Sequence, residues 1–113
     1  MKFDDTRDEL QVLLQKNRDK QDELEQRLKK LAFGEEKILQ LLREDGIAVE
    51  CLYNGWTGED AEKYIMRSLE ETETIRKKYA QAFSQEKERL WDEMKKLQEQ
   101  EQDISANLKS MRG

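Results

Sequence analysis

The sequence predicts an all-α protein: an elongated antiparallel two-helix hairpin with its turn at about residues 53–58 of a single domain, 1–113. Three observations support this prediction. Pro is absent and only 5 Gly occur among 113 residues, so little interrupts long helices. Apolar residues recur at spacings of three and four on both sides of one central turn signal. The chain is 35% hydrophobic and 42% charged, which suits helices that each bury one stripe better than it suits a thick core.

The first helix is expected from about residue 6 to about residue 53. Thr6 followed three residues later by Glu9 has the spacing of a capping box, which predicts the start. Gly34 and Gly46 each cost about 1 kcal/mol relative to Ala inside a helix, so a kink there, or a break into three helices, is the main alternative. A heptad seam runs along this helix through Leu10, Leu14, Leu24, Leu28, Leu31, Ile38, Leu42, Val49 and Leu52, with Asn17, Gln21, Glu35 and Asp45 as polar interruptions.

Two of these interruptions, Asn17 and Gln21, lie near the open end of the predicted hairpin. Polar groups in a seam commonly fix the register or the choice of partner at some cost in stability. The alternative is that this end of the hairpin frays and is simply wet. Both interpretations stay open on the sequence.

The turn is predicted from glycines and helix-capping residues near the middle of the chain. The run Tyr53-Asn54-Gly55 is expected to end the first helix, because a Gly just beyond the last periodic residue commonly takes a left-handed conformation. Thr57 and Asp60 have the spacing of a second capping box, and Trp56 is placed to fold onto the new first turn. Gly58 is expected where the two arms approach each other, since it carries no side chain.

The second helix is expected over about residues 58–111, so the two arms have similar lengths and each reaches about 70 Å at 1.5 Å per residue. Its heptad register is not kept throughout. The eleven-residue step from Tyr79 to Leu90 shifts the apolar stripe around the helix, which predicts local unwinding or a change of packing partner. The stripe contains Ala61, Tyr64, Ile65, Ser68, Ile75, Tyr79, Ala82, Phe83, Leu90, Met94, Leu97, Ile104, Leu108 and Met111.

Two helices paired along one seam leave apolar side chains uncovered. Burying a Leu-sized side chain yields only about 1.5 to 3 kcal/mol before conformational entropy is subtracted, so a lone hairpin is expected to be marginally stable. Scattered exposed apolar residues are normal, which is one interpretation; the other is that the hairpin completes a four-helix bundle with a partner. Residues off the seam are Leu13, Phe33, Leu39, Leu41, Phe83 and Trp91. Those predicted for helix packing or the partner interface are Leu24, Leu28, Leu31, Ile38, Leu42, Phe83, Leu90 and Trp91.

The sequence offers no catalytic chemistry. His is absent, which removes the commonest general base and the commonest metal ligand. Cys51 therefore has no imidazole to activate it, and it is expected to be a small buried or half-buried residue near the helix end. Acidic runs such as 70–73 are expected to be solvated helix faces. We predict that the protein is not an enzyme, with no catalytic residue, no cofactor and no metal site.

The charge pattern favours a protein partner over other classes. The net charge of −5 comes without a basic block or a Gly-rich phosphate loop, which argues against nucleic acid and against an anionic membrane as partners. A single Cys suits a reducing compartment. No segment resembles a signal peptide and no apolar run approaches about 18 residues, so a cytosolic chain is expected.

The turn carries a motif of known type. Trp56 and Gly58, followed by Ala61 and Tyr64, resemble the W-x-G-x-x-A-x-x-[F/Y] signature of the WXG superfamily, the helical hairpins of type VII secretion systems. The motif covers 56–64, and the overall plan of the superfamily matches the whole chain. The resemblance implies a helical hairpin that pairs with other helices.

One departure narrows the resemblance. Exported members often carry a tail motif Y-x-x-x-[D/E], whereas here Tyr64 is followed at that spacing by Ser68 and Tyr79 by Phe83. The chain is therefore most similar to the small WXG-like targeting factors that accompany LXG toxins. By resemblance, such factors bind the helical N-terminal LXG domain of a toxin together with a second small WXG-like helical protein, and help deliver the complex to the secretion machinery.

The resemblance implies a bacterial cytoplasmic location, with co-export alongside the partner left open. Two other functions stay open on the residues. The chain could be an exported WXG-type protein that forms a homodimer, or a coiled-coil scaffold segment unrelated to secretion.

Overall fold

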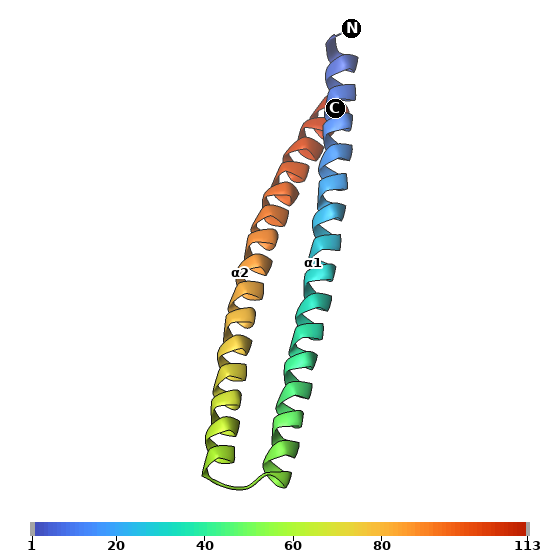
Figure 1. Ribbon diagram of the computed structural model, residues 1–113. Helices are drawn as coiled ribbons and strands as arrows, with labels where there is room; N and C mark the ends of the chain where they lie inside the picture. Colours follow the sequence, from blue (N-terminus) through green and yellow to red (C-terminus); the bar gives the residue numbers. More distant parts are fainter. Residues whose placement is uncertain (1, 113) are drawn as a thin grey trace. The chain divides into compact units, whose positions relative to one another are not determined.

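The computed structural model describes the backbone of residues 2–112 and the side chains of residues 5–52 and 54–111. Within it the protein consists of two helices of 54 residues each, α1 (Lys2–Gly55) and α2 (Glu59–Arg112), joined by a short link (Figure 1). Segments of α1 pack antiparallel against segments of α2. The predicted all-α class and the antiparallel pairing of two long helices are confirmed.

The helix pair divides into two compact units. The terminal unit combines Met1–Lys29 with Lys87–Gly113, and the turn unit is Lys30–Glu86. In α2 the division falls between Glu86 and Lys87, inside the step from Tyr79 to Leu90 where the apolar stripe shifts around the helix. The expected local unwinding is absent, because α2 is helical through this step; the packing divides there instead.

Each unit has a thin core. In the terminal unit Leu24, Leu90 and Met94 are buried between α1 and α2, and in the turn unit the buried apolar residues are Val49, Ala61 and Ile65. Among the described side chains none of the large ones is completely shielded from solvent. At about 1.5 to 3 kcal/mol for each large side chain, such cores supply little stability beyond the cost of ordering the chain.

The first helix begins earlier than the capping box predicted. α1 starts at Lys2, so Thr6 and Glu9 lie inside the helix and the expected start at residue 6 is wrong. Asp5 lies in the first turn, where negative charge is favourable beside the positive end of the helix dipole. Helix formation upstream of Thr6 therefore needs no side-chain cap at that residue.

The end of α1 differs from the predicted left-handed terminator. Gly55 is the last residue of the helix, and it has no positive φ. The backbone N–H of Trp56 donates to the carbonyl of Leu52 at 2.8 Å, which continues the helical hydrogen-bond pattern by one residue past Gly55. The chain reverses after Gly55, in the link of residues 56–58, where Gly58 has the positive φ.

Gly58 forms the start of α2. Its carbonyl accepts the first helical hydrogen bond, from the N–H of Glu62 at 3.0 Å, so Gly58 occupies the cap position and the predicted cap at Thr57 with Asp60 is wrong. Its φ of 122° is one that residues with a side chain rarely adopt. A Cβ added there would meet no atom within 4 Å, so backbone conformation and not close approach of the arms explains this glycine.

Gly34 and Gly46 do not break the first helix. α1 is continuous through both positions, which makes the three-helix alternative wrong. A Cβ added at either position would meet nothing within 4 Å. Neither glycine is therefore required by packing, and each carries only its entropic cost within the helix.

We predict opposite effects of alanine at Gly58 and at Gly34. Gly58→Ala forces a side chain into a sparsely populated conformation and should lower the free energy of unfolding by about 1 to 3 kcal/mol. Gly34→Ala should raise it by about 0.5 to 1 kcal/mol, because the helix already accommodates a Cβ there. Urea unfolding followed by circular dichroism at one protein concentration measures both. Equal changes in the two variants would contradict the explanation given for Gly58.

Candidate protein-interaction surface

Exposed apolar side chains concentrate in the turn unit. Among the described side chains, ten of the thirteen large apolar residues with high exposure belong to this unit and three to the terminal unit. In the turn unit, large apolar residues with high exposure thus outnumber the three buried apolar residues of its core. Its ten exposed residues are Phe33, Leu41, Ile47, Leu52, Trp56, Tyr64, Met66, Leu69, Ile75 and Tyr79.

Several of these residues lie where α2 cannot cover them. Phe33 and Ile47 are two heptads apart on the face of α1 opposite the seam, and their exposed fractions are 61% and 54%. The Nζ atom of Lys37 lies over the Phe33 ring, 5.3 Å from its centroid, and gives it only a partial cover. A second helix pair is the kind of structure that covers such outer positions.

One side of the turn unit is hollowed into a groove, which we call the turn groove. It has a volume of about 280 Å³ and lies between α1 and α2. Across its floor the Oγ1 atom of Thr72 donates to Oδ2 of Asp45 at 3.1 Å. The groove is lined by Asp45, Ala48, Val49 and Leu52 from α1, and by Tyr64, Ser68, Glu71, Thr72 and Ile75 from α2.

The motif residues gather at the turn end of this unit. The rings of Trp56 and Tyr64 pack together, with centroids 5.6 Å apart and planes inclined at 54°. Ala61 is the most buried core residue at 1% exposure, whereas Tyr64 is 53% exposed and lines the groove instead of filling the seam. Gly58 sets the backbone at the start of α2. These residues thus form a turn with a half-exposed aromatic pair beside the turn groove.

The predicted packing residues separate into three levels of burial. Leu24 and Leu90 are buried, Trp91 is exposed by 59%, and the others are half-buried: Leu28, Leu31, Ile38, Leu42 and Phe83. Of the residues predicted to lie off the seam, Leu13, Phe33, Leu41 and Trp91 are exposed, but Leu39 and Phe83 are half-buried. The Phe83 ring lies 6.4 Å from that of Tyr79, which accounts for part of its cover.

Four large residues assigned to the seam and one cysteine are more exposed than predicted. The four have exposed fractions of 43% to 53%, and they are Leu52, Tyr64, Ile75 and Tyr79. Cys51 is a free and exposed thiol, so the expectation that it is buried is wrong. It lies between the seam positions 49 and 52 and falls outside the contact between α1 and α2.

The terminal unit contains a buried polar network centred on Asn17. This residue is only 4% exposed, and its Nδ2 atom donates to the carbonyl of Leu97 at 2.9 Å and to Oε1 of Gln100 at 3.4 Å. Its Oδ1 atom accepts from Nε2 of Gln21 at 2.6 Å. Asn17 is therefore an ordered, satisfied group, and the wet, fraying end considered for it is wrong.

Glu101 extends this network across the unit. Its carboxylate accepts from Nε2 of Gln21 and, at 3.5 Å, from Nε of Arg18. These bonds join residues some eighty positions apart in the sequence, so they form in only one alignment of α1 against α2. The network therefore specifies the register of the terminal unit.

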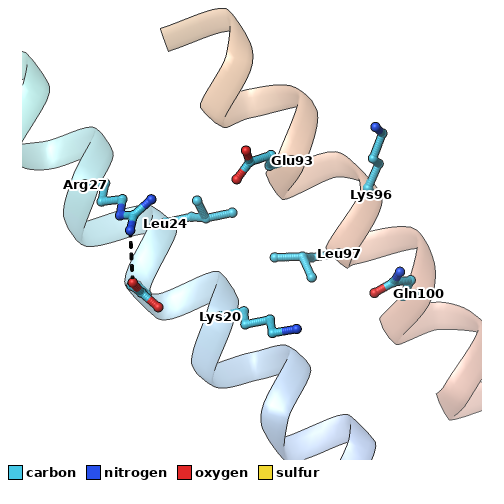
Figure 2. Close-up of a pocket in the computed structure, with 8 residues that line it drawn as sticks. Lys20, Leu24, Arg27, Glu93, Lys96, Leu97 and Gln100 are labelled. Carbon is cyan, nitrogen blue, oxygen red and sulfur yellow. Dashed lines mark hydrogen bonds and ion pairs between the residues drawn. The ribbon is translucent and has the colours of Figure 1, made fainter. Parts of the chain in front are cut away.

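A second groove, the terminal groove, lies between α1 and α2 in the terminal unit and has a volume of about 360 Å³. Figure 2 shows Leu24 and Leu97 pointing toward each other across it. Its charged side chains partly neutralise one another, as in the pair Arg27 to Glu23 at 3.3 Å. The lining residues are Lys20, Glu23, Leu24, Arg27, Glu93, Lys96, Leu97 and Gln100.

The ion pair of Glu73 and Arg76, on the surface of the turn unit, shifts the pKa of both side chains. Arg76 binds the Glu73 carboxylate through two nitrogens, Nε at 2.9 Å and a terminal nitrogen at 2.5 Å. These hydrogen bonds lower the pKa of the Glu73 carboxyl, with desolvation opposing and the charges of Arg76 and Lys77 adding to the effect. They also raise the pKa of Arg76. The pair ties two positions on the same face of α2 together.

Among its described residues the chain has neither a metal-binding cluster nor a membrane-spanning helix. The side chains of residues 5–52 and 54–111 include no group of three or more His, Cys, Asp or Glu arranged to hold a metal ion. No helix within residues 2–112 is both long enough and apolar enough to cross a membrane. The chain matches no protein-family model, no curated protein and no solved structure. The exposed apolar surface of the turn unit is thus the best-defined candidate site.

We predict that the Asn17 network limits conformational choice more than it adds stability. Asn17→Leu removes both a buried amide and its hydrogen bonds, so the free energy of unfolding should change by no more than about 1 kcal/mol or should rise. The variant should show more than one set of backbone NMR signals around residue 17, because the bonds of Arg18 and Gln21 to Glu101 that remain are not fully buried and specify the register less strictly. Gln11→Leu adds the same side chain at an exposed position and should keep a single set. A single set in Asn17→Leu would contradict the assigned role.

We predict that Arg76→Gln raises the pKa of Glu73 toward its ordinary value, while Lys77→Gln raises it less. Because the pKa of Glu73 is lowered in the folded chain, the pair stabilises the helix above the ordinary pKa of Glu, and the contribution is lost as the pH falls through the lowered value. NMR titration of the Glu73 carboxyl carbon measures the shift. An unchanged titration in Arg76→Gln would show that another group sets it.

Proposed function

We propose that this chain is a non-enzymatic helical adaptor that binds the helical N-terminal LXG domain of a type VII secretion toxin and helps deliver it to the secretion machinery. The observation that carries the proposal is the exposed apolar surface of the turn unit. The motif of Trp56, Gly58, Ala61 and Tyr64 adds the resemblance to the WXG superfamily and hence the secretion context. The bacterial cytoplasm is the proposed location before delivery.

The distribution of exposed residues supports a helical partner over other classes of ligand. Phe33 and Ile47 lie on the outer face of α1, while Leu52, Tyr64 and Ile75 border the turn groove. These side chains lie on different sides of the turn unit. Partner helices that pack on more than one side would bury all of them, as in a four-helix bundle. A small molecule in one pocket would leave most of them in water.

The aromatic pair at the turn supports a role in assembly. Trp56 is 43% exposed and rests on Tyr64. A large ring held in place by another ring loses little side-chain entropy on binding, which is why Trp and Tyr are frequent in the centres of protein interfaces. We propose that Trp56 contacts the partner or the secretion machinery directly.

A homodimer is the alternative that the same exposed surface supports, since a second copy also supplies two helices. Mass measurement of the purified chain separates the two. A stable homodimer that persists on dilution favours the self-associating function, whereas a marginally folded chain that is stabilised only by another helical protein favours the adaptor.

Co-expression tests the adaptor function directly. The full chain is produced with the proteins encoded beside it, including any LXG-type toxin domain and any second small helical protein, and is recovered by affinity purification. A stable complex containing the toxin domain is the expected result. Failure to recover any helical partner while the chain itself is soluble would remove the proposal.

We predict that Trp56→Ala weakens assembly with the partner by tenfold or more while leaving helical content nearly unchanged. The expected loss corresponds to about 1.4 kcal/mol or more, which is typical of an aromatic anchor. Trp56→Phe is the matched control, since it keeps a ring against Tyr64, and it should retain most of the affinity. Binding is measured by titration calorimetry and helicity by circular dichroism. Parallel losses in both measurements would make Trp56 a structural residue only.

A further inference from the structure

We infer that the turn groove accepts an amphipathic helix whose apolar anchors are flanked by Lys or Arg side chains. This inference deepens the proposed function and rests on it, because it names the chemistry of the helix and the place where it docks. It follows from the charge around the groove, from the lining of the groove and from its length. Each is independent of the motif at the turn.

The negative charge of the chain is concentrated in residues 44–71, the stretch that supplies most of the lining of the turn groove. Residues 44–71 contain eight Asp or Glu and two Lys or Arg, a net charge of −6, whereas the whole chain carries −5. The remaining residues therefore sum to +1. Of the two cations, Lys63 lies 3.3 Å from the carboxylate of Glu59 and is already partly neutralised. The turn end of the molecule is thus an acidic surface on an otherwise balanced chain.

The lining of the turn groove follows the same pattern. Its charged side chains are Asp45 from α1 and Glu71 from α2, and no Lys or Arg lines it. The terminal groove, also between the two helices, has Lys20, Arg27 and Lys96 in its lining together with acidic residues. The two grooves therefore differ in the charge they present, and the turn groove combines an apolar surface with carboxylates from both helices.

The length of the turn groove suits a helix. Its lining on α2 runs from Tyr64 to Ile75, which at 1.5 Å per residue is about 16 Å or three turns. A partner helix that presents apolar residues at i, i+4 and i+7 fits within that length. Leu52, Tyr64 and Ile75, each about half exposed, supply the apolar contacts. Basic residues beside those anchors would meet Asp45 and Glu71.

A second copy of this chain is a poorer occupant. The chain outside residues 44–71 carries only +1 in total, so it offers no strongly basic helix to match the groove. Its densest basic run, 76–78, includes Arg76, which is held by Glu73. Charge complementarity therefore favours a different protein, and it acts chiefly on the choice of partner and on the rate of association.

The test uses two synthetic helical peptides with the same Leu face, one with Lys and one with Glu on its flanks. Each carries a fluorescent label and is titrated with the full-length chain, and binding is followed by fluorescence anisotropy. The Lys-flanked peptide should bind at least tenfold more tightly at about 0.01 M salt. Most of this difference should vanish at about 1 M salt, where the Debye length falls from about 30 Å to about 3 Å.

Charge reversals locate the binding. Glu71→Lys, in the lining of the turn groove, should weaken binding of the Lys-flanked peptide by roughly fivefold. Glu99→Lys makes the same change at an exposed position of the terminal unit and should leave the affinity unchanged. Ile75→Asp, which removes an apolar contact in the groove, should weaken both peptides.

Three results would overturn the inference: equal affinity for the two peptides, equal effects of Glu71→Lys and Glu99→Lys, or self-association of the chain that Ile75→Asp abolishes. Failure of the inference and failure of the proposed function remain distinguishable. If both peptides bind equally and Ile75→Asp weakens both, a helix docks in the turn groove but the groove does not prefer Lys or Arg flanks. If neither peptide binds, the groove is not the docking place, and the co-expression experiment decides the adaptor function separately.

Discussion

The apolar surface that a helix pair can bury is limited, because one helix can cover only one stripe of the other. In the turn unit this leaves a core of Val49, Ala61 and Ile65, while many larger side chains stay in water. A second pair of helices would bury the outer faces and the groove at the same time, which is the arrangement that gives four-helix bundles their stability. The exposed surface is therefore better understood as half of an interface than as an accident of composition.

The two units differ in the polar side chains that join their helices and in the apolar side chains that they expose. The terminal unit buries Asn17 and satisfies it through Leu97, Gln100 and Gln21, a choice that specifies one alignment at some expense of stability. In the turn unit a hydrogen bond from Thr72 to Asp45 joins the two helices beside the exposed apolar side chains. Alignment is thus set near the chain ends, and apolar surface is displayed near the turn.

Periodicity in the sequence was enough to predict both helices, their antiparallel pairing and buried positions such as Leu24, Ala61 and Leu90. It failed at the helix starts, because the spacing of Thr6 or Thr57 shows that a cap is available and not that the helix needs it. It failed at Ile75 because a period gives the direction of a side chain and not how much of it the facing helix covers. The family rests on the turn motif and on the overall plan of the chain, and the partner rests also on the exposed apolar surface; both stay predictions.

Two glycines in the interior of α1 have a mechanical consequence. Gly34 and Gly46 interrupt no packing, since the space beside each is open to at least 4 Å. Bending the helix at these points would break no side-chain contact of the glycine itself, and glycine resists backbone torsion least of all residues. Gly34 and Gly46 are therefore the positions in the interior of α1 at which a bend of the helix would cost least.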